Sequence, residues 1–302
     1  MNELIYRLDN LIEPKSRNQV SDLLQETFNL DLSLFNKLGI LTEDYRALSF
    51  LEKDRVVANV SYFPMPIMIN GKAIAAAGIQ SVATRPEFRG RGLFRKLMQK
   101  SLDDMGTRHS CQFLQTNQPE LYHCFGFKSL EHHTFTGSLT SPFKRPVSTR
   151  QYDLQIETPE DLQLIQKLFT KRAPVSLRFG LMAHMASFVL NVLYNRQWHL
   201  SYFPDPDVMI VWDQVGEQTR LIDVVGASFP SAELIGGCLG RSRDITVCFP
   251  PDRLEGTFKS LRGITTRVQN KNGVERKKSV LMMRGTTNFS NSQIGLPPTA
   301  DF

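Results

Sequence analysis

The spacing of apolar positions over the first 130 residues predicts strands and helices in a mixed order. Apolar residues recur at helical spacing over residues 20–30, whereas residues 48–51 and 55–69 have the composition of strands. Asn70 and Gly71 are typical of a type I′ hairpin turn. An opening strand at Tyr6, a strand at 75–83, a helix after it and a strand at 111–116 complete the pattern. It predicts an α/β (α+β) fold with a mixed, mostly antiparallel sheet flanked by helices.

A glycine turn follows the apolar strand at 75–83 and leads directly into an amphipathic helix. The turn reads Arg89-Gly90-Arg91-Gly92, and the apolar stripe of the helix then begins at Leu93. Glycines let the backbone approach a ligand closely, and the first amides of a helix lack acceptors within it. Residues 82–100 carry six Lys and Arg against one acid. The segment therefore predicts a phosphate-binding turn at a helix N-terminus.

The spacing of this turn does not fit a Walker motif or a dinucleotide fingerprint. Arg89-x-x-Gly92-x-Phe94 resembles the Q/R-x-x-G-x-G/A signature of the GNAT superfamily of N-acetyltransferases, with Phe94 in place of the usual small residue. Members of that superfamily hold the pyrophosphate of coenzyme A in this turn and pair its pantetheine arm with the preceding strand. The resemblance implies acetyl-CoA as cosubstrate. The residues expected to bind it are Val82, Ala83, Thr84, Arg89, Gly90, Arg91, Gly92, Leu93 and Phe94.

A second motif lies one helix and one strand further along the chain. Tyr122 precedes a Phe-Gly-Phe string at 125–127, which is similar to the second hallmark of the GNAT superfamily. The resemblance implies that Tyr122 is catalytic and protonates the departing thiolate, because a phenol with a pKa near 10 stays protonated at neutral pH. Asn117 is expected to hold the start of a helix or the pantetheine. The alternative for Tyr122 is a core aromatic with a satisfied hydroxyl.

The chain has 302 residues, about twice the usual length of one domain. A polar, proline-containing stretch at 139–150 predicts a linker, which divides the chain into a GNAT domain at 1–138 and a second domain at 151–302. Strand and helix patterns repeat after residue 150 in nearly the same order, with Thr158 as a helix cap and Asn272-Gly273 as a turn. No R-x-x-G-x-G string occurs there. We therefore expect a degenerate GNAT-like copy without acetyl-CoA, in a tandem arrangement similar to the enhanced intracellular survival type of aminoglycoside acetyltransferase and to mycothiol synthase.

Composition narrows the possible partners. The net charge of +6 is concentrated at the glycine turn, which argues against nucleic acid as the partner. His132 and His133 are adjacent and face opposite ways on a strand, here expected at the surface, so no metal site is predicted. The four cysteines lack close pairs, which favours reduced thiols in the cytoplasm. The apolar stretch 181–194 is too short to span a bilayer, so no membrane partner is expected. The oligomeric state stays open.

These observations together predict an acetyl-CoA-dependent N-acetyltransferase that acts on an amine of a small molecule or peptide. The general base is not identified. The strand before the turn contains Gln80 and no acid, His123 lies beside Tyr122, and for the final residues 299–302 a disordered end is expected rather than a tail that returns to the site. Two alternatives remain: a noncatalytic acyl-CoA-binding or regulatory protein, and another acyltransferase on the same fold.

Overall fold

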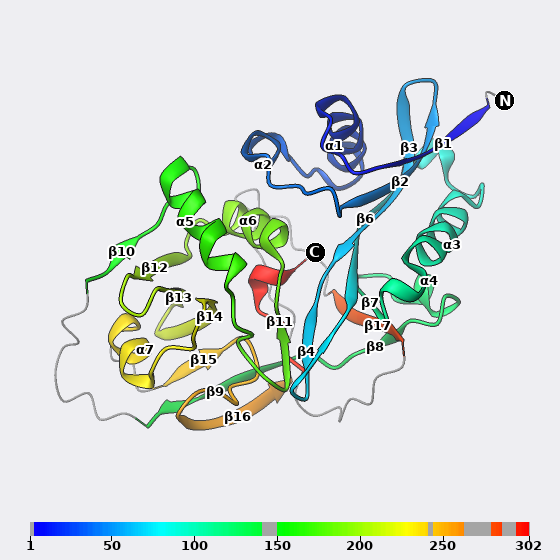
Figure 1. The fold of residues 1–302 in the computed structure, drawn as a ribbon. Coiled ribbons are helices and arrows are strands. Elements are labelled where there is room, and N and C mark those ends of the chain that lie inside the picture. Colours follow the sequence, from blue (N-terminus) through cyan, green and yellow to red (C-terminus); the bar gives the residue numbers. More distant parts are fainter. Residues whose placement is uncertain (1–2, 141–149, 241–243, 263–278, 286–293, 302) are drawn as a thin grey trace.

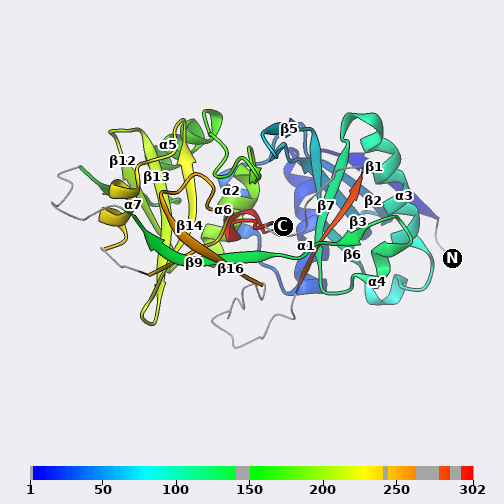
Figure 2. The same ribbon diagram turned by 90° about the horizontal axis from the view of Figure 1, so that it is seen from below.

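The computed structural model describes residues 3–140, 150–240, 244–262, 279–285 and 294–301. Two seven-stranded mixed sheets lie side by side, and the C-terminal residues lie between them (Figures 1 and 2). The first sheet has the order β1 (Leu4–Asp9), β2 (Arg46–Glu52), β3 (Arg55–Pro64), β6 (Ala76–Thr84), β7 (Cys111–Thr116), β17 (Val280–Gly285), β8 (Lys128–Ser129).

Helices cover both faces of the first sheet because apolar side chains alternate along its central strands. The helix α3 (Leu93–Met105) packs on the face that carries Ile79 and Leu114. The helix α1 (Pro14–Phe28) packs on the opposite face, which carries Phe113. Four short elements complete this half: α2 (Ser33–Leu38), η1 (Pro86–Phe88), η2 (Gly106–Arg108) and α4 (Glu120–His123).

The second sheet repeats the strand arrangement of the first. Its order is β10 (Tyr152–Asp153), β12 (His199–Phe203), β13 (Val208–Val215), β14 (Gln218–Gly226), β15 (Ile245–Val247), β9 (His133–Leu139), β16 (Gly256–Arg262). In each sheet the fourth and fifth strands are parallel and the other neighbours are antiparallel. The helices α5 (Pro159–Thr170) and α6 (Met185–Tyr194) cover one face, and α7 (Ala232–Cys238) covers the other. The duplicated fold class expected from the sequence is confirmed.

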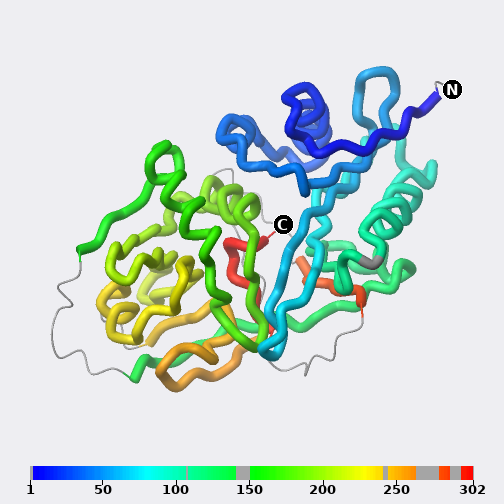
Figure 3. The backbone as a smooth tube through the Cα atoms, viewed as in Figure 1, coloured from blue at the N-terminus to red at the C-terminus, as the bar shows by residue number. Residues whose placement is uncertain are grey.

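The two sheets exchange their sixth strands. The strand β9 comes from the first half of the chain and pairs with β15 and β16, whereas β17 comes from the end of the chain and pairs with β7 and β8. Figure 2 shows β9 running from the first half into the second sheet, and Figure 3 shows residues 280–285 beside residues 111–116. A cut at 139–150 therefore divides the chain without separating the sheets, because each sheet needs one strand from the other side of that cut.

A third, small sheet also joins the halves. It contains β11 (Phe179–Leu181), β4 (Ile67–Ile69) and β5 (Lys72–Ile74). Asn70 and Gly71 have φ of 47° and 77°, which confirms the predicted type I′ hairpin between β4 and β5. The single strand expected at 55–69 is interrupted between β3 and β4, since Met65 and Pro66 lie between them.

The helix cap predicted at Thr158 is only partly confirmed. Thr158 is the N-cap residue of α5, but its side chain makes no capping hydrogen bond. The carboxylate of Asp161 instead accepts a hydrogen bond from the amide of Gln155 at 2.8 Å, which closes the same turn. The predicted Asn272-Gly273 turn and most of the predicted linker lie outside the described residues.

Candidate active site

The glycine turn has the geometry of an anion site. Gly90 and Gly92 have φ of 75° and 73°, and a Cβ placed on either would meet nothing within 4 Å. Gly92 is the N-cap of α3, and the amide of Lys96 donates to its carbonyl at 3.1 Å. The amides of Leu93 and Phe94 precede this first helical bond, so they have no acceptor inside the helix. The turn therefore presents backbone donors to open space.

Two arginines flank these donors. Nε of Arg89 donates to the carbonyl of Thr84 at 3.1 Å, and Arg91 donates to the carbonyl of Glu87 at 3.0 Å. The Arg91 guanidinium also lies 4.7 Å from the centroid of the Phe88 ring. Each side chain is fixed at one point and is otherwise exposed. The remaining N–H groups have no hydrogen-bond partner given among the described residues and can meet an anion at the turn.

A network of ion pairs stabilises the segment that leads into the glycine turn. Arg85 is 1% exposed, donates to the carbonyl of Val56 at 2.7 Å and pairs with Glu26 of α1. Arg55 lies 3.0 Å from both Glu26 and Glu87. This network ties α1 and β3 to η1, immediately before the glycines. In the sequence, Arg85 is one of the positive charges near the turn. Its burial could not be predicted there, because it depends on how α1 packs.

The strand before the turn diverges from its parallel neighbour. The described pairs between β6 and β7 run only from Ala76 with Cys111 to Ile79 with Leu114. On its other edge, β6 stays paired with β3 as far as Thr84. The backbone of Val82, Ala83 and Thr84 thus has no described strand partner on the β7 side. An extended ligand arm can pair with such an edge.

A β-bulge marks the point of divergence, and a buried polar cluster holds it. Ser81 has φ of 55°, and the register of β3 with β6 shifts opposite it. Nδ2 of Asn59 donates to the Ser81 carbonyl at 2.8 Å and to the Ser61 hydroxyl at 2.9 Å, and Oδ1 of Asn59 accepts from Ser49 at 2.8 Å. The apolar pattern of the strands does not predict this cluster. The available signal was the polar Asn and Ser within an otherwise apolar strand, where a buried polar group needs a partner.

Tyr122 lies against the start of α3. Its ring is 5.5 Å from that of Phe94, edge to face, and 6.1 Å from that of Phe127. Tyr122 is 6% exposed, and burial raises its pKa to about 12 against a smaller opposing effect of the Thr116 hydroxyl. The two sequence motifs therefore converge through Phe94, the residue that departs from the family signature. The phenol is therefore protonated at neutral pH.

Asn117 does not begin the helix that carries Tyr122. The helix α4 starts at Glu120, with Pro119 as its N-cap. The turn between β7 and α4 is closed by a hydrogen bond that the amide of Gln118 donates to the Thr116 hydroxyl at 3.0 Å. Asn117 is exposed at the end of β7, so a contact with the pantetheine arm stays a prediction.

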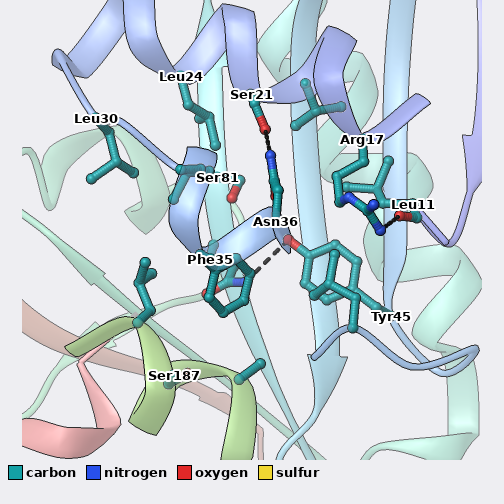
Figure 4. A pocket seen from close by; sticks show the side chains of 16 residues that line it. Leu11, Arg17, Ser21, Leu24, Leu30, Phe35, Asn36, Tyr45, Ser81 and Ser187 are labelled. Carbon is teal, nitrogen blue, oxygen red and sulfur yellow. Dashed lines mark hydrogen bonds between the residues drawn. The ribbon is translucent and has the colours of Figure 1, made fainter. Parts of the chain in front are cut away.

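A pocket lies on the α1 face of the first sheet, beside the β-bulge at Ser81 (Figure 4). Its cavity volume is about 50 Å³, and residues from α1, α2, β6 and α6 line it. Gln80 and Ser81 of β6 belong to the lining, and Nε2 of Gln80 donates to the Tyr45 hydroxyl at 3.1 Å. Both halves of the chain therefore contribute to a pocket beside the diverging strand.

The C-terminal segment returns to the centre of the molecule. Residues Pro298–Ala300 form the short helix η3, in which Thr299 is fully buried. Nε2 of Gln115 donates to Oδ1 of Asp301 at 2.9 Å, and Nδ2 of Asn191 donates to the Asp301 carbonyl at 2.7 Å. The disordered end expected for this segment is wrong as far as residue 301, because side chains from both halves bind its backbone and side chains.

Asp301 brings a carboxylate close to the diverging strands. Gln80 and Gln115 each follow the last described pair of β6 and β7, on the face opposite Ile79 and Leu114. This is the same face that α1 and the C-terminal segment cover. His123, the other proposed base, is exposed on α4. Of these two side chains, Asp301 is the one held directly by a residue of the diverging strands.

The ring of His132 binds the C-terminal segment, whereas the ring of the adjacent His133 binds β16. The His132 ring accepts from the amide of Leu296 at 3.0 Å, and the His133 ring contacts the Ser260 hydroxyl at 2.7 Å. They face opposite ways as predicted, but His133 is buried rather than at the surface. Among the described residues, no group of three His, Cys, Asp or Glu side chains could hold a metal ion. Within the same residues, no helix is long and apolar enough to cross a membrane.

Comparison with known proteins agrees with this geometry. Residues 11–130 match the family model described as an acetyltransferase (GNAT) domain, and this part of the chain is a GNAT acetyltransferase domain. A curated relative, the uncharacterized N-acetyltransferase YhbS of Escherichia coli, is 26% identical over 99 residues. That match covers 33% of this chain and 54% of YhbS, so the chain spans about half the length of this relative.

Two solved structures share the fold over nearly the whole chain. A probable N-acyltransferase of Enterococcus faecalis has a TM-score of 0.58 at 13% identity, and the match covers 94% of this chain and 72% of that one. Eis1 of Mycobacterium abscessus has a TM-score of 0.55 at 14% identity, covering 92% and 73%. At these identities the likeness concerns the fold alone.

Proposed function

We propose that the protein is an acetyl-CoA-dependent N-acetyltransferase, in which an acceptor amine attacks the thioester directly in a ternary complex. The observation that carries the proposal is the divergence of β6 from β7 beside a glycine turn with open backbone donors. The edge of β6 at Val82, Ala83 and Thr84 would pair with the pantetheine arm. The turn from Arg89 to Phe94 would hold the pyrophosphate through amides and charge.

Two side chains would move the protons. Acetyl transfer to an amine requires loss of the ammonium proton and protonation of the departing thiolate. Tyr122 would donate to the sulfur: its phenol is protonated at neutral pH and can hydrogen-bond the developing thiolate, although the burial that raises its pKa also makes it a weaker acid. Asp301, held by Gln115 on the acceptor face, would accept the proton from the amine.

The second half of the chain would shape the acceptor pocket and bind no acetyl-CoA. Its parallel strands β14 and β15 pair only from Thr219 with Ile245 to Leu221 with Val247, so they diverge as β6 and β7 do. Beyond the last pair, however, Asp223 of β14 binds Arg172 at 2.6 Å and the Thr299 hydroxyl at 2.5 Å. Buried side chains and η3 thus occupy the part of the second sheet that corresponds to the cofactor edge of the first.

The test is thiol release by the full-length chain with acetyl-CoA and a panel of primary amines. We expect amine-dependent release of free thiol and an acetylated amine by mass spectrometry. Tight acetyl-CoA binding without release for any amine would favour the noncatalytic acyl-CoA-binding alternative, which the absence of an acid on β6 supports. Release only with other acyl-CoA compounds would favour another acyltransferase. The predicted location is the cytoplasm, where the free cysteines would remain reduced.

A further inference from the structure

A buried carboxylate of the second sheet holds the C-terminal segment that carries Asp301. Oγ1 of Thr299, in η3, donates to Oδ2 of Asp223 on β14 at 2.5 Å. Both side chains are fully buried. Figure 1 shows this segment in red beside α6, between the two sheets. The proposed proton transfers do not use Asp223, so the contact points to another role for this carboxylate.

Asp223 lies where the strands of the second sheet diverge. The last pair that β14 forms with β15 involves Leu221, and Asp223 is the second residue beyond it. Ser81 has the same place in the first sheet, two residues beyond Ile79. In the second sheet, Oδ1 of Asp223 accepts from the amide of Val224 at 2.8 Å. The position that corresponds to the proposed cofactor edge therefore carries a charged group, and this group binds the chain's own C-terminal segment.

Other buried groups fix the Asp223 carboxylate. Nη2 of Arg172 donates to its Oδ1 at 2.6 Å, and Nε2 of His184, at the N-cap of α6, lies 3.5 Å from its Oδ2. Burial raises the pKa of Asp223, but the Arg172 charge and the hydrogen bonds to the carboxylate outweigh this effect and lower the pKa. The carboxylate is therefore ionised at neutral pH. A hydrogen bond to an ionised acceptor is stronger than one between neutral groups, which favours a firmly held Thr299.

The anchored hydroxyl lies two residues before Asp301. Nδ2 of Asn191 donates to the carbonyls of Thr299 and Asp301 at 3.3 and 2.7 Å, and the amide of Asp301 donates to the carbonyl of Pro298 at 3.3 Å. These bonds leave the backbone between Thr299 and Asp301 little freedom. A fixed Thr299 hydroxyl therefore also fixes the Asp301 carboxylate against Gln115.

We infer that Asp223 and Thr299 are positioning residues for Asp301. Their hydrogen bond holds the C-terminal segment so that the Asp301 carboxylate stays beside the diverging strands of the first sheet. The inference rests on the proposed function, in which Asp301 accepts the proton of the amine. It gives the second half of the chain a part in the reaction of the first half.

Replacing Thr299 tests the role of its hydroxyl in the full-length chain. Thr299→Val removes the hydroxyl and keeps the shape of the side chain, whereas Thr299→Ser keeps the hydroxyl. The measurement is single-turnover acetyl transfer from acetyl-CoA to the primary amine that gives the fastest thiol release in the panel. We expect Thr299→Val to slow transfer about tenfold at neutral pH, the factor typical for loss of one hydrogen bond to a charged group. Thr299→Ser should retain the wild-type rate, and Thr299→Val should share the pH–rate profile of Asp301→Asn.

A double-mutant cycle separates positioning from a general loss of structure. If Thr299 acts through Asp301, Thr299→Val should cause no further loss of rate in the Asp301→Asn background. Thr246→Val is the matched control, since it removes a buried hydroxyl of β15 that contacts Thr136 and Gln218. It should leave the rate unchanged in both backgrounds, and unchanged coenzyme A affinity verifies the folding of each variant. Equal slowing by Thr299→Val in both backgrounds would overturn the inference.

Hydrogen exchange tests the anchor without measuring activity. The amides of Ala300 and Asp301 donate to the carbonyls of Pro297 and Pro298, and in Thr299→Val they should exchange about tenfold faster than in the wild type. Thr299→Ala, which also lacks the hydroxyl, should give the same result. Wild-type exchange in both variants would overturn the inference, whatever their activity. Faster exchange, but no turnover of any amine by the wild type, would instead overturn the proposed function and leave the anchoring of the segment as inferred.

Discussion

Nε2 of Gln115, on β7, donates a hydrogen bond to Oδ1 of Asp301 at a distance of 2.9 Å. The contact joins a strand of the first sheet to the C-terminal segment that Asn191 of α6 also binds. Asp301 is therefore fixed from both halves of the chain, beside the strands that diverge at the proposed cofactor edge. These contacts give the carboxylate a defined place on the α1 face of the first sheet.

Replacing Asp301 by Asn should slow acetyl transfer most at low pH. Alkylamines have pKa values near that of Lys, about 10.4, so at neutral pH nearly every acceptor carries a proton that a base must remove. Without the carboxylate, only the neutral fraction of the amine reacts, and the rate should rise about tenfold per pH unit. The pH–rate profile of the chemical step checks this. The exposed Asp103→Asn is the matched control, and parallel profiles for wild type and Asp301→Asn would rule out Asp301 as the base.

Replacing Arg89 and Arg91 together by Glu should weaken coenzyme A binding more than tenfold. Charge-assisted hydrogen bonds contribute on the order of 1.5–3 kcal/mol each, and the substitution adds repulsion at the same turn. Titration calorimetry measures the affinity for coenzyme A, and the difference in affinity between variant and wild type should be smaller at high salt. The double variant Lys167→Glu and Lys259→Glu makes the same change of net charge on exposed side chains of the second half. Equal affinities in the two double variants would contradict the assignment of the turn.

Tyr122→Phe should slow the chemical step by roughly 10² to 10⁴ while leaving cofactor affinity nearly unchanged. The substitution keeps the ring contacts with Phe94 and Phe127 and removes only the hydroxyl. Single-turnover measurements avoid masking by product release. Tyr62→Phe is the control, since that phenol is equally buried in the same core but binds Asp104 at 2.5 Å. A wild-type rate for Tyr122→Phe would make Tyr122 a structural aromatic.

His184 should make the second half of the chain sensitive to acid. Burial and the neighbouring Arg172 charge lower the pKa of His184 to about 4, although Asp223 partly opposes the shift. A histidine in the unfolded chain titrates near 6.5, so the unfolded state binds more protons between pH 6.5 and 4. Stability should therefore fall as the pH falls through this range, by about 1.4 kcal/mol per pH unit at most.

Urea unfolding at pH 7, 6 and 5 measures this dependence. His184→Gln should make it shallower, because one titrating group is gone while His132 and His109, whose pKa values burial also lowers, remain; the exposed His199→Gln should leave it unchanged. An equally steep loss of stability in His184→Gln would assign the acid sensitivity to other groups.

The exchange of β9 and β17 predicts that neither half folds alone. A fragment of residues 1–150 lacks β17, which leaves the edge of β7 unpaired and part of the core exposed. We expect no cooperative thermal transition for this fragment and recovery when residues 151–302 are co-expressed with it. Co-purification and circular dichroism measure both effects. A monomeric 1–150 fragment with a cooperative transition would show that the exchanged strand is dispensable.

The sequence by itself determined the features that depend on neighbours along the chain. The turn at Gly90 and Gly92, the helix after it and the hairpin at Asn70 and Gly71 follow from local backbone preferences and apolar spacing. The repeat of the strand order in the second half was also visible, because the periodicity of apolar positions can be detected where no ligand-binding motif is present.

Only the tertiary structure decided which distant segments share a site. The exchanged strands, the position of Asp301 beside Gln115, the Asn59 cluster at the bulge and the pocket between α1 and α6 all join residues far apart in the sequence. A strand pattern specifies which face is apolar, but not which sheet edge it will join. That choice depends on the total packing and hydrogen bonding of the folded chain, and no local pattern of residues encodes it.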